Sequence, residues 1–184
     1  KKYLGIPLNK IPSPSEANES FAECFADEFV NVFTQLGVEA KILWQSKLHE
    51  DGTLDEAIKI ALDKADEIAN IYQEVSGSKN KRTDWVPFQP ICQKCGKIGT
   101  TKAIKWDGKE VEYKCLEDLV SYALGCGYHG KVSPFGGTGK LPWKVYWPAR
   151  WFALHINIEG EGKDLASMGG ARDVANHIAK KIYK

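Results

Sequence analysis

Apolar and polar positions in the first third of the chain predict two long helices separated by a strand. From about Glu16 to Leu36, phenylalanine and aliphatic side chains recur every three or four residues, which is the spacing of an amphipathic helix. Val38 to Trp44 is short and apolar enough for a strand, and Leu54 to Val75 repeats the helical spacing. This order of elements indicates half of a layered α/β fold whose strand pairs in parallel with others.

The middle of the chain has a different pattern. The polar stretch Ser76 to Asp84 has no apolar anchor and is typical of a linker. Ile98 to Trp106 and Lys109 to Tyr113 then predict a β-hairpin around the turn at Asp107-Gly108. We therefore expect an inserted β unit over about residues 85–135.

The last part of the chain predicts a return to the main fold. Pro142 and Pro148 argue against one continuous helix, so we expect only a short helix from Pro148 to Ala153. Leu154 to Ile158 alternates like a strand, and Arg172 to Tyr183 has the pattern of a closing helix. The predicted units are residues 1–84, the insertion 85–135, and residues 136–184.

Composition limits the classes of protein that this chain can represent. The formal net charge of +1 argues against binding to nucleic acid through global charge, although a local patch is compatible with it. No apolar run is long enough to span a bilayer, and there is no signal-peptide pattern. Five cysteines without a secretory context favour a reducing compartment, the cytoplasm. The start at Lys1-Lys2 rather than Met indicates a piece of a longer protein.

Four cysteines predict a structural zinc site within the insertion. Cys92 and Cys95 form a Cys-x-x-Cys knuckle, and Cys115 follows the predicted hairpin. The fourth ligand is Cys126 or His129, of which Cys126 is favoured because four thiolates form the commonest closed site. Four protein ligands leave no open position for catalysis. The alternative is a group of free buried thiols.

Two further segments are candidates for ligand binding. Trp143, Trp147 and Trp151, with Arg150 among them, suit a wall that holds an alkyl stem or a planar base beside a charge. The alternative is that these rings only pack in the core.

The second segment is glycine-rich and lies before the closing helix. Asp164 is a candidate partner for ribose hydroxyls, and Gly162, Gly169 and Gly170 would allow close approach of a nucleotide. An ordinary surface loop would have the same composition. Of the nearby histidines, we expect His155 to be a core residue on its strand and His177 to face solvent.

The run Lys140-Leu-Pro-Trp-Lys-Val-Tyr-Trp-Pro-Ala-Arg-Trp151 resembles the tryptophan-rich signature of the class I, archaeal-type lysyl-tRNA synthetases. Agreement in the same order extends along nearly the whole chain. The other matching segments are Gly5-Ile6-Pro7-Leu8, Glu19-Ser20-Phe21-Ala22-Glu23, Ala57-Ile58-Lys59-Ile60-Ala61-Leu62, the knuckle at Cys92, Gly162-Lys163-Asp164 and Gly169-Gly170.

This resemblance implies a middle segment of a Rossmann-like class I nucleotide-binding fold that carries a zinc-ribbon or rubredoxin-like β insertion. It further implies a parent enzyme that activates lysine with ATP and Mg and transfers it to tRNA, while the segment alone is inactive. The lysine pocket would include Trp147, Trp151 and Arg150. The residues implied to face the adenosine are Gly162, Asp164, Gly169 and Gly170.

The chain departs from the family pattern at several polar positions. Leu165 replaces a histidine, Ala171 replaces a serine, and Tyr146 stands at an acidic position. The phosphate-binding signatures His-x-Gly-His and Lys-Met-Ser-Lys-Ser do not occur in this sequence. These departures keep open a non-catalytic relative or a zinc-ribbon nucleic-acid-binding module. The lysines that favour such a module are Lys79, Lys81, Lys102, Lys105, Lys109 and Lys114.

Overall fold

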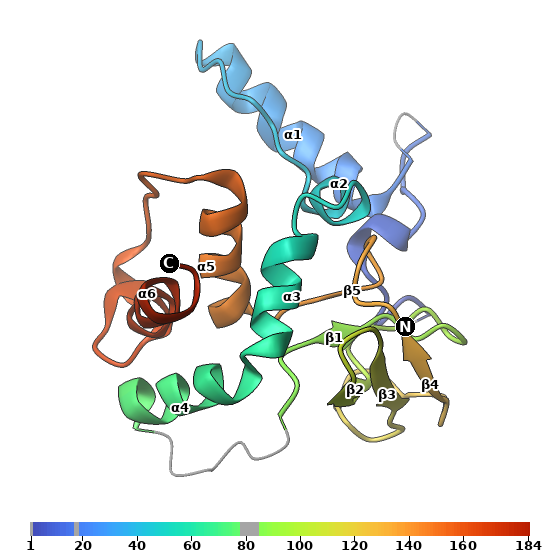
Figure 1. The fold of residues 1–184 in the computed structure, drawn as a ribbon. Helices are drawn as coiled ribbons and strands as arrows, with labels where there is room; N and C mark the ends of the chain where they lie inside the picture. The colour runs from blue at the N-terminus through green and yellow to red at the C-terminus, as the bar shows by residue number, and fades with distance from the viewer. Residues whose placement is uncertain (1, 17–18, 78–84) are drawn as a thin grey trace.

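A group of helices and a small antiparallel sheet make up the body of the molecule, and one helix stands away from both (Figure 1). The computed structural model describes residues 2–16, 19–77 and 85–184. The elements, in chain order, are η1 (Leu8–Lys10), α1 (Phe21–Gln35), α2 (Gln45–Glu50), α3 (Asp55–Asp63), α4 (Ala65–Ser76), β1 (Gln89–Pro90), β2 (Thr101–Trp106), β3 (Val111–Cys115), β4 (His129–Val132), β5 (Gly139–Lys140), α5 (Trp143–Leu154), η2 (Lys163–Ala166) and α6 (Ala171–Ile182).

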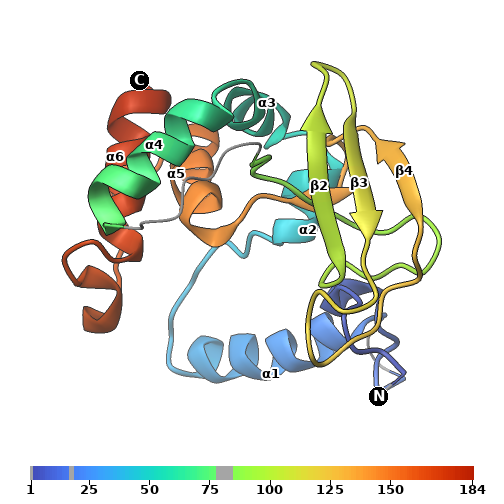
Figure 2. The same cartoon turned by 90° about the horizontal axis from the view of Figure 1, so that it is seen from below.

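The main core lies among helices α3, α4, α5 and α6, which lie close together in Figure 2. Each contributes an apolar face, represented by Ile58, Ile68, Val145 and Ile178, and these side chains are buried. The Tyr183 hydroxyl donates a hydrogen bond of 2.9 Å to the Ala57 carbonyl and so joins the end of α6 to α3. The predicted closing helix is thus confirmed as α6.

The sheet has the order β2-β3-β4, and both of its strand pairings are antiparallel. The predicted hairpin is confirmed, because β2 and β3 flank the expected turn. The Asp107 carboxylate accepts hydrogen bonds from the backbone N–H groups of Lys109 and Glu110 at 3.0 and 2.8 Å. Gly108 has a φ of 92°, which glycine adopts without the strain that a side chain brings.

Apolar packing and one hydrogen bond attach the sheet to the helices. Ala103 and Val111 lie on its inner face and belong to the helical core. The Trp106 indole donates its N–H to the Asp63 carboxylate at 2.8 Å, across from β2 to α3. The short strands β1 and β5 pair where the chain enters and leaves the segment that contains this sheet. The domain boundaries at 84/85 and 135/136 remain predictions.

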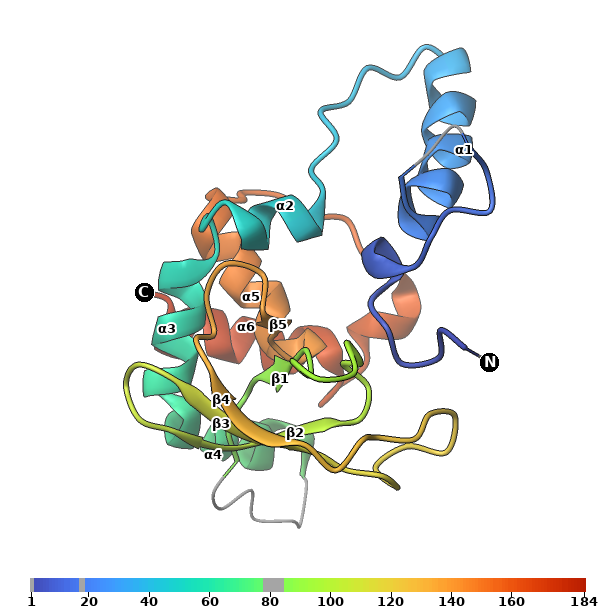
Figure 3. The ribbon, with the colours of Figure 1, turned by 90° about the vertical axis from the view of Figure 1, so that its right-hand side faces the viewer.

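Helix α1 begins later than expected and is less buried than its pattern predicts. It starts at Phe21 because Ser20 and Glu23 form a capping box, in which each side chain binds the backbone N–H of the other residue. No residue of α1 is buried, and Phe25, Phe29 and Leu36 are exposed. Figure 3 shows α1 projecting from the body. Helix α1 contacts η1, but the side chains of Phe25, Phe29 and Leu36 are left exposed.

Two predicted strands are wrong. Val38 to Trp44 has no strand structure, and it pairs with none of the strands in the described residues. Leu154 ends α5, and the residues after it to Ile158 form an irregular segment. His155 adopts the left-handed conformation at the helix end and is exposed, so it is no core histidine, whereas His177 faces solvent as expected. The parallel pairing expected of these strands is also absent from the described residues, where all pairings are antiparallel.

The two other corrections concern helices. Pro148 does not open a short helix, because it lies inside the continuous helix α5, which begins directly after Pro142. The burial of Tyr146, Trp147 and Ala149 on both sides offsets the lost hydrogen bond. The predicted helix from Leu54 to Val75 is split at Lys64 into α3 and α4.

The predicted linker, Ser76 to Asp84, lies mostly outside the described residues, as do Lys79, Lys81 and Arg82. The segment between Cys115 and Cys126 forms a loop. None of the helices that the structure describes is both long and apolar enough to cross a membrane.

Candidate functional sites

Four cysteines from three separate segments meet at one end of the sheet. Cys92 and Cys95 come from the knuckle after β1, Cys115 ends β3, and Cys126 follows the loop from β3. Their sulfur atoms all lie within 4.8 Å of one another, and no disulfide joins them. The Cys92–Cys126 and Cys95–Cys115 sulfur separations are 3.6 and 3.8 Å.

These separations fit a tetrahedral metal site. A zinc–sulfur bond of about 2.3 Å places tetrahedral sulfur ligands about 3.8 Å apart. The Cys126 backbone N–H points at the Cys115 sulfur at 3.3 Å, a contact that stabilises a thiolate. His129, the alternative fourth ligand, lies on β4 with its Nε2 2.7 Å from Glu112 and is not a member of the group.

In the absence of a metal, burial makes Cys92 and Cys95 poor acids, whereas hydrogen bonds outweigh burial at Cys126 and lower the pKa of that thiol. Desolvation raises the pKa of Cys92, and it raises the pKa of Cys95 to about 12. The closed interior beside Tyr113 contributes to this burial. A cation among the sulfur atoms reverses the effect, because a coordinating thiol is deprotonated by the ion. The donor set therefore suits a soft or borderline divalent metal such as zinc.

The tryptophan run forms one face of α5. The ring centroids of Trp143 and Trp147 are 5.2 Å apart, and those of Trp147 and Trp151 are 5.4 Å apart, so the three rings form a row. Trp147 is buried with 3% of its surface exposed, and Trp143 is exposed. The run was predicted either to pack in the core or to form a ligand-binding wall. The middle ring, Trp147, packs in the core, whereas the outer rings, Trp143 and Trp151, are accessible.

A carboxylate that follows α5 fixes the end of this row. Glu159 accepts hydrogen bonds from the Arg150 guanidinium through one oxygen and from the Trp151 indole through the other. Burial favours the neutral carboxyl, but the hydrogen bonds from Trp151 and Arg150 outweigh it and lower the pKa of Glu159 below its usual range. Glu159 is therefore ionised at neutral pH.

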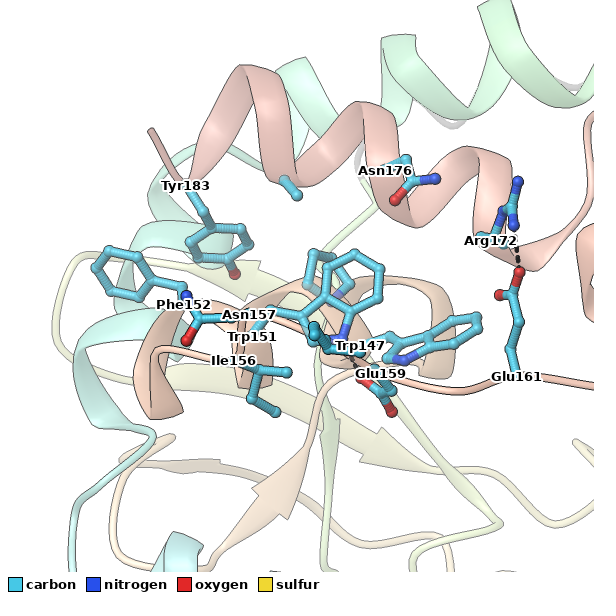
Figure 4. Close-up of a pocket in the computed structure, with 13 residues that line it drawn as sticks. Trp147, Trp151, Phe152, Ile156, Asn157, Glu159, Glu161, Arg172, Asn176 and Tyr183 are labelled. Atoms are coloured by element: carbon cyan, nitrogen blue, oxygen red, sulfur yellow. Dashed lines mark hydrogen bonds and ion pairs between the residues drawn. The ribbon is translucent and has the colours of Figure 1, made fainter.

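A cavity of about 500 Å³ opens between α5, the segment after it, and α6 (Figure 4). Aromatic rings form one wall, and a second ion pair, between Glu161 and Arg172, lies at its edge. The polar and aromatic residues that line it include Trp147, Trp151, Asn157, Glu159, Glu161 and Arg172. The Nε1 atom of Trp147 is buried without a hydrogen-bond partner among the described residues.

The sequence-predicted ligand residues do not all meet at this cavity. Trp147 and Trp151 line it, whereas Arg150 acts on it through Glu159. The adenosine candidates Gly162, Asp164, Gly169 and Gly170 lie in the loop before α6 and are not among the lining residues.

Backbone geometry in the glycine loop is specific at one position. Gly169 has a φ of 69°, and a Cβ there would lie 2.9 Å from the Val75 carbonyl oxygen. Its N–H donates to the Asp173 carboxylate at 2.9 Å. Gly169 is thus required by the turn into α6 whether or not a ligand is bound. Asp164 is exposed and lies in the turn η2.

Sequence reasoning missed the acidic side of the cavity. Glu159 and Glu161 lie in the glycine-rich segment that was a candidate for ligand binding, but they were not among its predicted contact residues. Arg172 was expected only as the start of the closing helix. The available signal was the proximity in sequence of two carboxylates to Arg150 and Trp151. Only the path of the chain after α5 shows that they meet.

Comparison with known proteins gives a consistent result. A family model described as tRNA synthetases class I (K) matches residues 1–184. The chain is 42% identical to lysine–tRNA ligase 1 of Methanosarcina acetivorans over 99% of its length, and 38% identical to the lysine–tRNA ligase of Methanocaldococcus jannaschii over 100%. It is 36% identical to the enzyme of that name from Picrophilus torridus.

The chain spans about a third of the length of these curated relatives, covering 32%, 33% and 34% of them respectively. The match to the family model nevertheless includes every region described above: the cysteine group, the tryptophan helix and the glycine loop. The chain therefore belongs to the class I (K) tRNA synthetase family.

Proposed function

We propose that this chain is part of a lysine–tRNA ligase that, with Mg, joins the lysine carboxylate to the α-phosphate of ATP. This step forms lysyl-adenylate and releases pyrophosphate; the lysyl group is then transferred to tRNA and AMP is released. The observation that carries the proposal is the similarity to lysine–tRNA ligases along the whole chain. Free thiols at all five cysteines suit a cytoplasmic protein. A Rossmann-like nucleotide-binding fold belongs to this proposal for the parent protein.

The cavity beside α5 is the proposed amino-acid site. An alkylammonium substrate has a charged end and an apolar stem, which need a carboxylate and an aromatic or aliphatic wall respectively. Glu159 and Glu161 supply carboxylates, while Trp147 and Trp151 supply the wall. Arg150 contributes by fixing Glu159, because its guanidinium is already bound to that carboxylate.

The glycine loop is the proposed nucleotide side of the site. Gly162, Asp164, Gly169 and Gly170 lie in the segment that joins the cavity wall at Glu161 to the start of α6. An exposed carboxylate such as Asp164 suits the ribose hydroxyls. Leu165 and Ala171 offer no polar side chain there, so the proposed binding depends on the backbone and on Asp164.

Zinc is the proposed metal of Cys92, Cys95, Cys115 and Cys126. The sulfur separations match a tetrahedral site, and the four thiolates occupy every position of such a site. The proposed role is structural: the ion fixes the segment before β2 to the ends of β3 and its following loop. These four residues are the cysteine quartet, whose sulfur atoms lie within 4.8 Å of one another.

Calorimetric titration tests the amino-acid site. A non-hydrolysable lysyl-adenylate analogue is titrated into the zinc-loaded 184-residue chain, with the arginyl analogue in parallel. We expect tighter binding of the lysyl analogue, and weaker binding by the variant Trp151→Ala. Trp143→Ala is the matched control, because Trp143 is an exposed ring of the same row that does not line the cavity.

Equal binding of both analogues would refute lysine selectivity at this cavity. Absence of binding by a folded chain would refute the proposed site and favour a non-catalytic relative of the ligases. Loss of binding in both tryptophan variants would show that the analogue is held elsewhere along α5.

A further inference from the structure

The outer face of the β2-β3-β4 sheet carries a group of lysines that the cavity does not use. Side chains alternate between the two faces of a sheet, and the inner face is marked by the buried residues Ala103 and Tyr113. The outer residues follow from the strand register, in which Lys102 is opposite Lys114 and Lys105 is opposite Glu112. The outer lysines are Lys102, Lys105, Lys114 and Lys131, and all four are exposed.

The pairing of Lys102 with Lys114 is unfavourable for the isolated sheet. Like charges that face each other directly across two antiparallel strands repel and reduce stability. The next residue in that row, on β4, is His129, which is no acid. Two lysines and a histidine thus lie side by side in this row, and none of its three positions is a carboxylate.

The few carboxylates nearby are already engaged. Glu112 contacts the His129 ring at 2.7 Å, and Asp107 pairs with Lys131 at 3.6 Å. Within the described residues, Lys102, Lys105 and Lys114 have no ion pair. Among the lysines of the described helices, Lys59 pairs with Asp63 and Lys181 with Glu74, while Lys47 and Lys180 are unpaired but do not face another lysine across a strand pair.

We infer that this outer face, defined by Lys102, Lys105, Lys114 and Lys131, binds the phosphate backbone of tRNA. The inference rests on the proposed function, and it names a surface away from the cavity at α5. Phosphates supply the negative charge that the Lys102–Lys114 row lacks. Lysine is a flexible point charge, so the contact positions the RNA without reading its bases.

An RNA backbone fits this face better than an acidic protein does. Protein interfaces depend on buried aromatic or aliphatic anchors in pockets. The one large apolar side chain exposed on this face is Ile104, at 37%, and no described cavity includes it. Several exposed cations on neighbouring strands suit a polyanion whose charges repeat along a chain.

Salt-dependent binding tests the inference. The dissociation constant of a tRNA transcript is measured by fluorescence anisotropy at several salt concentrations, with the full 184-residue chain and with the triple variant Lys102→Gln, Lys105→Gln, Lys114→Gln. Each lost phosphate contact reduces the slope of log K against log salt by about 0.7–0.9. We expect a slope lower by roughly two to three and binding weaker by about tenfold or more at low salt.

Two further variants make the result specific. The control Lys41→Gln, Lys47→Gln, Lys180→Gln removes the same charge from exposed lysines elsewhere, and we expect it to bind nearly as the parent chain does. The charge-preserving variant Lys102→Arg, Lys105→Arg, Lys114→Arg is expected to retain binding. Circular dichroism and thermal melting check that each variant is folded.

Failure of this inference differs from failure of the proposed function. Unchanged affinity and slope in the glutamine variant, or equal losses in the control, would overturn the RNA surface. Tighter binding of an acidic peptide than of tRNA would overturn it in favour of a protein partner. The lysyl-adenylate titration does not involve these lysines, so continued binding of that analogue would leave the proposed function standing.

Discussion

Trp151 donates its indole N–H to Glu159, eight residues later in the chain, and Arg150 binds the other oxygen of the same carboxylate. One side chain thereby fixes an aromatic wall of the cavity and neutralises the nearest cation. The segment after α5 is irregular, and these two contacts hold it against the helix. The shape of the cavity therefore depends on an acid outside the tryptophan run.

Replacing Glu159 by glutamine should weaken this arrangement while keeping the size of the side chain. Glutamine can accept only one of the two hydrogen bonds, and the Arg150 charge loses its counterion. Hydrogen bonds to charged groups are worth about 1.5–3 kcal/mol, and partial exposure reduces this, so we expect a loss of about 1–2 kcal/mol. Urea denaturation measures it. Glu161→Gln is the control, with a smaller loss, because its partner Arg172 is about half exposed; equal losses would contradict the assigned role.

The same carboxylate predicts a response to acid. The pKa of Glu159 is lower in the folded chain than in the unfolded chain, so its stabilisation is fully present above the unfolded value of about 4.3. This stabilisation is lost as the pH falls through the lower, folded pKa. We expect tryptophan fluorescence to report release of Trp151 below about pH 4. A titration of Glu159→Gln should lack that transition, and an identical curve would assign it to another group.

Removal of the proposed zinc ion should unfold the region around the sheet before the helices. Structural zinc in small domains contributes about 10–16 kcal/mol, more than a small core such as that around Tyr113 supplies. We expect a chelator, or Cys92→Ser, to abolish bound zinc and to lower the melting temperature strongly. Cys24→Ser is the matched control, because Cys24 lies on α1 away from the quartet. Full stability of the zinc-free chain would refute the structural role.

Substitution of the tryptophans should separate packing from binding. Trp147 is almost fully buried, so Trp147→Ala leaves a cavity and should cost about 3–5 kcal/mol of unfolding free energy. Trp143→Ala removes an exposed ring and should cost well under half of that. Guanidinium denaturation compares the two variants. Similar costs would show that Trp143 is also a core residue in solution.

Predictions from local chemistry agree well with the structure. The hairpin follows from the Asp107-Gly108 turn. The predicted helix start at Glu16 was too early, because the capping box of Ser20 and Glu23 sets the start of α1 at Phe21. The cysteine quartet was predictable because the Cys-x-x-Cys spacing and the strand before Cys115 each place a thiol by short-range geometry.

Predictions that required a distant partner fared worse. The strand at Val38 to Trp44 needs a neighbouring strand, and the apolar face of α1 needs a surface, which local pattern does not supply. The helix-breaking rule failed at Pro148, because burial of Trp147 and Ala149 outweighed the cost of one missing hydrogen bond. Glu159 was missed because an irregular segment determines where its carboxylate lies.

The bond from the Tyr183 hydroxyl to the Ala57 carbonyl affects the timing of folding during translation. The two residues are 126 positions apart. A ribosome adds about 5–20 residues per second, so α3 leaves the exit tunnel on the order of ten seconds before its partner. The sheet, whose contacts are local, can form during that interval. The helical core is completed only when α6 has been synthesised. Until then the apolar side of α3 lacks part of its packing partners and is exposed to aggregation.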